Sequence, residues 1–274
     1  MSSTLKSLSG LLYSGGKLVR AGHRTASEIR PFEIIPDFIS SAEGSALIRL
    51  GETRVICTAS VESGVPAFLK GTGKGWISSE YAMIPRATEI RTPREVTRGR
   101  PSGRTMEIQR LIGRSLRAVV NLEKLGERTV WVDCDVIRAD GGTRTASITG
   151  AMAALALAFR KLKDRKVISG IPLNDFVAAI SVGIIGKEAL LDLDYSEDSS
   201  AEVDMNVVMT GSGRFVEVQA TAEGLPFGND DMARLIELAR PAIQQLIAMQ
   251  KSITKVDLPA MSPDAAGLRP GQGA

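Results

Sequence analysis

The stretch "DCDVIRADGGTRTASITGA", residues 133–151, contains the local pattern that decides the fold. Its first part alternates polar and apolar residues as a strand does, and its last part is a run of small residues typical of a helix. The turn between them holds Gly141, Gly142, Thr143 and Arg144. Either this is a tight turn that caps the helix, or it is an anion site of free backbone N–H groups beside a guanidinium. The stretch alone leaves both interpretations open.

The composition is that of an ordinary globular protein. The 274 residues, 43% hydrophobic and 24% charged, suffice for one large domain or two small ones. No apolar stretch approaches the length of a membrane span. Cys57 and Cys134 each lie in an apolar, strand-like run and form no CxxC pair. This pattern predicts reduced, buried thiols in a cytoplasmic protein and gives no support for a zinc site.

The two ends of the chain differ in composition from its middle. The first residues, "MSSTLKSLSGLLYSGGK", have a short apolar patch without a signal-peptide core or cleavage site. The tail after Lys255 is rich in Pro, Gly and Ala. We therefore predict a flexible extension over residues 1–19, one domain over residues 20–254, and a disordered tail over residues 255–274.

Strand and helix patterns are interspersed along the middle of the chain. The mixture implies an α+β fold, in which mixed sheets are packed by helices. The predicted elements are a hairpin (45–50 and 53–61), an amphipathic helix (105–122), a buried helix (145–162), four strands (176–185, 189–195, 201–210 and 214–221) and a closing amphipathic helix (231–249).

The formal net charge of +3 hides a strong segregation of charge. Residues 86–117 contain nine arginines, no lysine and three acids, whereas residues 188–213 contain acids but no lysine or arginine. Two solvated faces that offset each other would explain this. Arginine without lysine, however, suits bidentate binding of phosphate, so we favour a polyanionic partner.

The acidic run contains a candidate reactive pair, Asp198 and Asp204. In an extended strand Asp204 shares a face with Glu202 and Asn206, away from the core, and Asp198 lies in the preceding turn. Two carboxylates beside a phosphate site repel each other unless a cation such as Mg²⁺ lies between them. The other acids of the run, Asp192 among them, are expected to be surface residues, and the alternative is that Asp198 and Asp204 are turn and surface acids as well.

Five motifs, in this order, resemble the bacterial ribonuclease PH family. They cover most of residues 20–251 and are far more specific together than any one glycine turn. The motifs are "GKGWISSEYAMIPRAT" (73–88), "SGRTMEIQRLIGRSLRAVV" (102–120), "ADGGTRTASITGA" (139–151), "EDSSAEVDMNVVMTG" (197–211) and "FVEVQATAEG" (215–224).

The resemblance implies a fold, an activity and an assembly. The fold would be the ribonuclease PH fold, whose core is related to the second domain of ribosomal protein S5. The activity would be that of a phosphate-dependent 3′-to-5′ exoribonuclease and tRNA nucleotidyltransferase. Such an enzyme trims tRNA precursors and other RNAs, ribosomal RNA included, releases nucleoside diphosphates, and adds nucleotides in reverse. The assembly would be a hexamer built from dimers.

The resemblance also implies roles for individual residues. Asp198 and Asp204 match the catalytic aspartates, as ligands of Mg²⁺ or Mn²⁺, with Asp204 protonating the leaving 3′ oxygen. The residues that match the phosphate site are Arg104, Gly142, Thr143 and Arg144. Three further arginines are expected to hold the RNA backbone or to support subunit contacts, and the sequence does not divide these roles: Arg86, Arg91 and Arg94.

One stretch departs from the family pattern. In "RAGHRTASEIRP" Gly22 and His23 stand where Asp and Gly are expected, while Arg24 and Arg30 persist. We assign His23, the only histidine, no role. Two other function classes are a catalytically silent RNA-binding subunit of an exosome-like ring and a phosphate-dependent enzyme acting on small molecules. The presence of both the phosphate site and the aspartate pair argues against the first, and the arginine-rich segment argues against the second.

Overall fold

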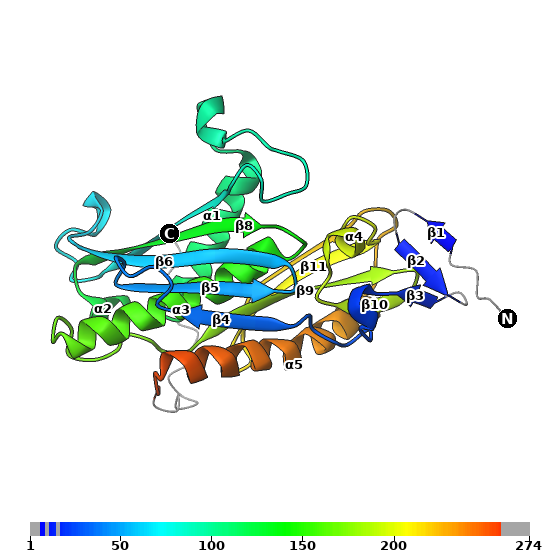
Figure 1. Cartoon of the computed structure of the whole chain (residues 1–274). Coiled ribbons are helices and arrows are strands. Elements are labelled where there is room, and N and C mark those ends of the chain that lie inside the picture. Colours follow the sequence, from blue (N-terminus) through cyan, green and yellow to red (C-terminus); the bar gives the residue numbers. More distant parts are fainter. Residues whose placement is uncertain (1–5, 9–10, 15–16, 259–274) are drawn as a thin grey trace, which may run out of the picture.

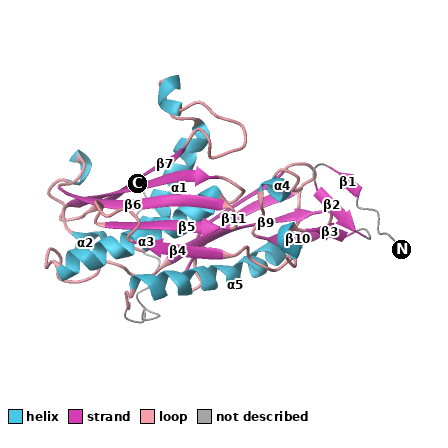
Figure 2. Cartoon of the chain, viewed as in Figure 1, coloured by secondary structure: helices cyan, strands magenta, loops and turns pink. Residues whose placement is uncertain are grey.

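A computed structural model describes residues 6–8, 11–14 and 17–258 of the chain (Figure 1). Two main sheets are packed by long helices, so the predicted α+β class is confirmed (Figure 2). The five-stranded sheet has the order β4-β5-β6-β8-β7 and the four-stranded sheet the order β10-β9-β11-β12. The strands are β4 (Phe32–Pro36), β5 (Gly44–Leu50), β6 (Thr53–Ser63), β7 (Trp76–Met83), β8 (Arg128–Arg138), β9 (Val177–Ile185), β10 (Glu188–Leu191), β11 (Val203–Thr210) and β12 (Phe215–Ala222).

The five-stranded sheet contains the predicted hairpin. Strands β5 and β6 pair antiparallel around Gly51, whose φ of +56° is a left-handed conformation that favours glycine. Strand β8 then pairs antiparallel with β6 and parallel with β7. Cys57 and Cys134 lie opposite each other in this register as buried free thiols, as predicted.

Helix α3 (Thr143–Asp164) lies between the two sheets and contacts both. Small residues allow this close approach. A Cβ on Gly150 would lie 2.8 Å from Ile48 and from the Cys57 sulfur, and a Cβ on Gly44 would lie 2.1 Å from the carbonyl oxygen of Ala154. The Ala-rich run therefore forms a buried helix whose face fits against the strands.

Helix α1 (Gly103–Arg117) and α5 (Asn229–Thr254) complete the packing, α1 against β7 and α5 against β9 and β10. The amphipathic pattern predicted α1 to reach residue 122, but it ends at Arg117. The chain then makes a bridge between Val120 and Leu173, and the side chain of Asn121 caps the short helix α2 (Leu122–Leu125). The buried residues of the pattern pack as predicted, and only the helix boundary was wrong.

The strand predicted over residues 189–195 also ends early, at Leu191. Asp192 has a left-handed φ of +55°, which stops the strand. The Asp194 side chain then accepts hydrogen bonds from the N–H groups of Ser196 and Glu197 and caps the short helix α4 (Tyr195–Asp198). This turn brings Asp198 in front of β11.

The ends of the chain are described only in part. Within the extension predicted to be flexible, three short strands form an antiparallel sheet: β1 (Lys6–Leu8), β2 (Leu11–Ser14) and β3 (Lys17–Val19). The structure thus has regular pairing where the sequence indicated none. After α5 the chain is still packed, with Val256 buried, and the rest of the predicted tail, residues 259–274, lies outside the described residues.

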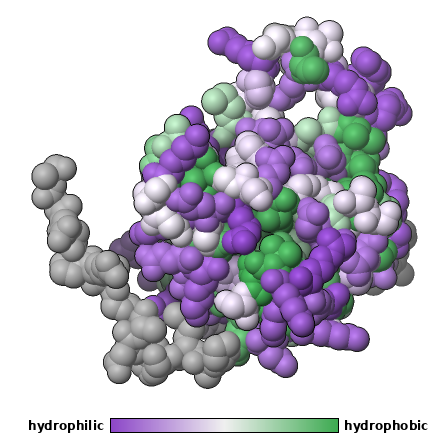
Figure 3. All heavy atoms as spheres, turned by 90° about the vertical axis from the view of Figure 1, so that its left-hand side faces the viewer, coloured by the Kyte–Doolittle hydropathy of each residue, from purple (hydrophilic) through white to green (hydrophobic). Residues whose placement is uncertain are grey.

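The surface of the described residues is mixed. In the part of the chain that the structure describes, no helix is long and apolar enough to cross a membrane. Figure 3 shows apolar side chains interspersed among hydrophilic ones over the face that it presents. The most exposed apolar residues include Leu225, Ile90 and Val96. Two of these, Ile90 and Val96, belong to the arginine-rich segment.

Candidate active site

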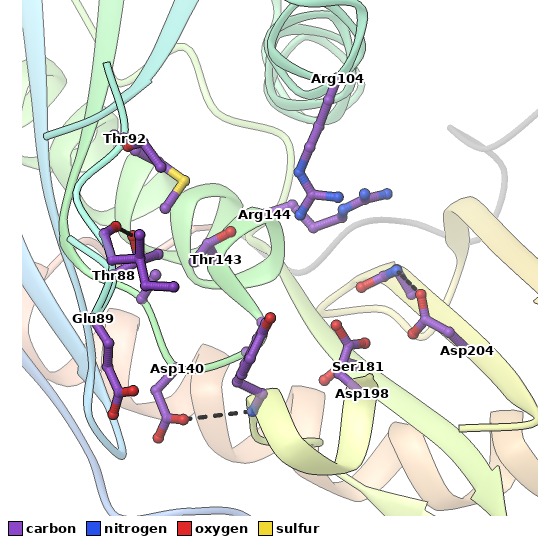
Figure 4. Close-up of a pocket in the computed structure, with 17 residues that line it drawn as sticks. Thr88, Glu89, Thr92, Arg104, Asp140, Thr143, Arg144, Ser181, Asp198 and Asp204 are labelled. Carbon is purple, nitrogen blue, oxygen red and sulfur yellow. Dashed lines mark hydrogen bonds between the residues drawn. The ribbon is translucent and has the colours of Figure 1, made fainter. Parts of the chain in front are cut away.

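A cavity of about 730 Å³ lies where the N-terminal ends of α1 and α3 face α4 and β11 (Figure 4). Residues far apart in the sequence meet here because α3 crosses between the sheets. The lining residues include every residue predicted for phosphate binding and both predicted catalytic aspartates: Arg104, Gly142, Thr143, Arg144, Asp198 and Asp204.

The cationic wall of the cavity begins at the turn before α3. Gly141 and Gly142 have φ of +74° and +65°, and Gly142 is the N-cap residue of the helix. A Cβ on Gly141 would lie 2.5 Å from the Leu193 carbonyl oxygen, so only glycine fits there. The first N–H groups of a helix have no partner within it, and the helix dipole adds positive potential at this end. The turn is thus both a cap and a suitable anion site.

Side chains of the cationic wall are fixed by neighbours. The Tyr81 hydroxyl donates to Thr143 Oγ1 at 2.9 Å. Arg144 Nη1 donates to Gln219 Oε1 at 2.9 Å and to Glu107 Oε1 at 3.3 Å. Figure 4 shows Arg104, from the first turn of α1, and Arg144 converging on the same part of the cavity. Two guanidinium groups therefore face one small volume, as an anionic group requires.

The acidic wall lies opposite, with Asp198 at the end of α4 and Asp204 near the start of β11. Burial, and then the nearby Asp198, raise the pKa of Asp204 to about 6, although Arg144 and Arg104 oppose the shift. Burial also raises the pKa of Asp198. Asp204 Oδ1 is buried and has no hydrogen-bond partner among the described residues, while Oδ2 accepts a long 3.5 Å bond from Asn206. The carboxylate of Asp204 is therefore poorly satisfied.

The three arginines expected to hold RNA are not in the cavity. Arg86, Arg91 and Arg94 are exposed on the segment between β7 and α1, which projects from the body of the molecule (Figure 1). Their neighbours in the sequence reach the cavity instead: Thr88, Glu89, Ile90 and Thr92. Within residues 94–104 one 3-10 turn forms (Glu95–Arg98), and α1 begins at Gly103.

Sequence reasoning missed several residues of the site. Tyr81 hydrogen-bonds to Thr143 from β7, but in the sequence it resembles any core residue of a strand. Arg144 is held by Gln219 of the edge strand β12 and by Glu107 of α1. Asn206 was placed on the face of Asp204 by alternation, and it lines the cavity with Asp204. The remaining lining residues without a predicted role are Met83, Ala139, Asp140, Gly141, Ser181 and Tyr195.

Comparison with known proteins agrees with the fold. The model of the 3′ exoribonuclease family, domain 1, matches residues 28–161, and that of domain 2 matches residues 175–242. The chain therefore belongs to the 3′ exoribonuclease family. It is 60% identical to the ribonuclease PH of Solibacter usitatus over 86% of this chain and 99% of that one. The ribonuclease PH of Bacillus subtilis is also 60% identical, over 89% and 100%. These relatives place the chain among the phosphate-dependent 3′-to-5′ exoribonucleases and nucleotidyltransferases.

Solved structures support the fold independently of this sequence identity. Rice Rrp46 has a TM-score of 0.70 at 20% identity, covering 86% of this chain and 100% of that one. A chain of the Archaeoglobus fulgidus exosome with RNA bound to the active site has a TM-score of 0.70 at 25% identity, covering 83% and 91%. The predicted ribonuclease PH fold is thus confirmed.

Proposed function

We propose that inorganic phosphate binds between the first turn of α3 and Arg104, and that RNA places its 3′-terminal phosphodiester beside it. One observation carries the proposal: Arg104 and Arg144, at the starts of two helices, face Asp198 and Asp204 across one cavity. Backbone N–H groups after Gly142 and the hydroxyl of Thr143 complete a set of anion donors. Phosphate and a phosphodiester are the ligands that such donors fit.

The reaction then follows from this arrangement. A phosphate oxygen attacks the phosphorus of the last phosphodiester, and the bond to the 3′ oxygen of the preceding nucleotide breaks. The leaving 3′ oxygen takes a proton, a nucleoside diphosphate is released, and the RNA is one nucleotide shorter. Arg104 and Arg144 stabilise the negative charge on the transferring group. The reverse reaction adds a nucleotide from a diphosphate.

Asp204 is the proton donor in this proposal. Without a bound cation, the pKa of Asp204 is raised to about 6, so a fraction of the carboxyl carries a proton near neutral pH. An acid with a pKa near the working pH is the most effective general acid. Burial contributes most to this raised pKa, and the negative charge of Asp198 adds to it.

A divalent cation, Mg²⁺ or Mn²⁺, fits the acidic wall. Asp204 Oδ1 is buried without a hydrogen-bond partner in the part of the chain that the structure describes, and carboxylate oxygens are the ligands that these hard cations prefer. Among the described residues no group of three or more His, Cys, Asp or Glu side chains is placed to hold a metal. Asp198 and Asp204 would therefore supply the protein ligands, and water or phosphate oxygens the others. Bound there, the cation would neutralise charge on the transferring phosphoryl group.

The RNA and the assembly belong to the same proposal. The exposed Arg86, Arg91 and Arg94 suit the backbone of a tRNA precursor or ribosomal RNA outside the cavity, and contacts between subunits. The similar Archaeoglobus structure is an exosome with RNA in its active site. We propose that this chain acts in the cytoplasm as a homohexamer, a trimer of dimers, on tRNA 3′ ends.

The decisive experiment uses a tRNA with extra 3′ nucleotides and the purified protein, with and without phosphate. We expect trimming only with phosphate, and nucleoside diphosphates as the product. Efficient trimming without phosphate, with monophosphates released, would make the protein a hydrolase. Binding of the RNA without any trimming would favour the catalytically silent RNA-binding subunit.

A further inference from the structure

Three arginines that precede the five-stranded sheet are buried. Arg20, Arg24 and Arg30 are 4%, 9% and 4% exposed, and each bonds to the segment between β10 and the end of α4. Asp192 lies in that segment. It was expected to be a surface acid, but it is fully buried, with 0% of its surface exposed. The expectation was wrong because buried arginines surround it, which a list of acidic residues does not show.

Arg30 pairs with Asp192 on one side of its guanidinium. Arg30 Nη2 donates to Asp192 Oδ1 at 2.7 Å, and Nε donates to Oδ2 at 2.9 Å. The backbone N–H of Arg30 also donates to Oδ2, at 2.8 Å. Both carboxylate oxygens are thus satisfied by one residue, in the bidentate geometry that arginine alone provides.

The other side of the same guanidinium contacts the phosphate turn. Arg30 Nη1 donates to the carbonyl oxygen of Asp140, and Nη2 donates to that of Gly141 at 3.5 Å. A Cβ on Gly142 would lie 3.2 Å from Arg30 Nη2. Arg30 therefore lies directly behind the turn whose front faces the cavity.

The turn that holds Asp192 is itself anchored. The N–H of Asp192 donates to the Ser181 carbonyl oxygen at 2.7 Å, and the N–H of Leu193 donates to Ser181 Oγ at 3.2 Å. Six residues after Asp192 comes Asp198, at the end of α4. One guanidinium thus ties the start of the cationic wall to the segment that leads into the acidic wall.

We propose that Arg30 and Asp192 form a positioning pair, which sets the distance between the phosphate-binding turn and Asp198. The inference rests on the proposed function for the phosphate site. Neither residue of the pair touches substrate in this proposal: they act through Gly141, Gly142 and α4. A lysine cannot replace Arg30, because a single ammonium reaches Asp192 or the Asp140 carbonyl but does not span both with a planar fork.

The test compares phosphate kinetics at saturating RNA in Arg30→Lys, Asp192→Asn and the wild type. We expect the phosphate KM to rise about tenfold and kcat to fall by a similar factor in both variants, because the lost bonds are charge-assisted. Gln250→Leu is the control for stability. It removes two buried hydrogen bonds, to the carbonyls of Thr149 and Val177, away from the cavity. It should unfold more easily yet keep the wild-type phosphate KM.

A milder variant, Thr53→Val, provides a test if neither Arg30→Lys nor Asp192→Asn folds. Thr53 Oγ1 donates to the Gly141 carbonyl at 2.7 Å and accepts from the Asp140 N–H at 2.9 Å, so it holds the same turn from β6. We expect a severalfold rise in phosphate KM.

Two kinds of failure are distinguishable by calorimetric titration of phosphate. A wild-type protein that binds no phosphate would overturn the proposed function and the positioning role with it. A wild type that binds phosphate, together with folded variants whose phosphate KM and kcat stay within twofold of it, would overturn only the positioning role. If only Thr53→Val folds, an unchanged phosphate KM in that variant would likewise overturn only the positioning role.

Discussion

The two walls of the cavity are built differently. On the cationic wall, Thr143 and Arg144 have hydrogen-bond partners that fix their positions. On the acidic wall, a buried oxygen of Asp204 has no hydrogen-bond partner from any described residue, and the pKa of the carboxyl is raised to about 6. A fixed, satisfied set of donors suits binding, whereas an unsatisfied acid suits chemistry. The contrast predicts that the two walls control different kinetic constants.

The largest effect is expected from Asp204→Asn. The substitution keeps the size and one oxygen of the side chain but removes the transferable proton, so the chemical step should slow by roughly 10²-fold or more. Phosphate affinity should change little, because the cationic wall is intact. Single-turnover trimming at saturating phosphate measures the step. Partial recovery with extra Mg²⁺ would show that metal ligation accounts for part of the loss.

The matched control for this change is Glu202→Gln. Glu202 lies just before β11, two residues ahead of Asp204, and is exposed to solvent, so its substitution should leave trimming within about twofold of the wild type. Asp192→Asn is unsuitable as a silent control because Asp192 is fully buried and paired with Arg30. A wild-type rate for Asp204→Asn, or a larger loss in Glu202→Gln, would remove Asp204 from the active site.

Arg104→Ala tests the cationic wall and should have the next largest effect. The loss of a charge-assisted hydrogen bond is worth ~1.5–3 kcal/mol, so the phosphate KM should rise by about one to two decades. RNA binding should change much less. Arg110→Ala, an exposed position on the same helix and outside the cavity lining, serves as the control. Phosphate saturation identical to wild type in Arg104→Ala would contradict the assignment.

The projecting segment should matter less for chemistry than either wall. The double change Arg91→Ala and Arg94→Ala removes two exposed charges that lie outside the cavity lining. We expect the KM for a 3′-extended tRNA to rise about five- to tenfold, with phosphate KM unchanged, because exposed charge contacts are weak singly. Trimming of a short oligonucleotide should be nearly unaffected.

Sedimentation of the wild type and of this double variant tests the proposed assembly. The wild type should have a mass well above that of one chain. A variant that loses the assembly would assign the arginines to subunit contacts, and one that keeps it but trims tRNA poorly would assign them to RNA. A fully active monomer would contradict the proposed hexamer.

The sequence predicted the parts of the site that local patterns or motifs encode. Alternation along residues 201–210 placed Asp204 and Asn206 on one face, and both line the cavity. The glycine turn before a helix indicated either a cap or an anion site, and the left-handed Gly141 and Gly142 are compatible with both. These features depend on neighbours within a few residues.

The parts that were missed depend on distant pairings. Arg30 and Asp192 are 162 residues apart in the sequence, and each is of a charged type that usually lies at the surface. Charged side chains become fully buried only when paired, and the pairing exists only once the fold is formed. The hydrogen bond from the Tyr81 hydroxyl to Thr143 could not be predicted for the same reason. In the sequence, Tyr81 resembles any apolar residue of a strand whose side chain faces the core.

The smallest expected effect is on the free energy of unfolding, and it separates the two walls most sharply. In the unfolded chain an aspartate has a pKa of about 3.9, whereas burial and Asp198 raise the pKa of folded Asp204 to about 6. The folded state therefore binds the Asp204 proton more tightly. The stabilisation that this proton provides is complete below about pH 4 and is lost as the pH rises towards and through 6. Above that pH, the ionised Asp204 destabilises the fold.

Asp204→Asn, which abolishes most activity, should therefore stabilise the metal-free protein at pH 8, by about 1–2 kcal/mol once partial exposure is allowed for. Urea unfolding in a chelating buffer, at steps from pH 4 to pH 8, measures the difference. It should grow between about pH 4 and 6 and then stay constant, while Glu202→Gln shows no such rise. An equal difference at pH 4 and pH 8 would mean that the folded pKa of Asp204 is not raised. Mg²⁺ should stabilise the wild type at pH 8 more than the variant, because only the wild type has two carboxylates facing the same volume.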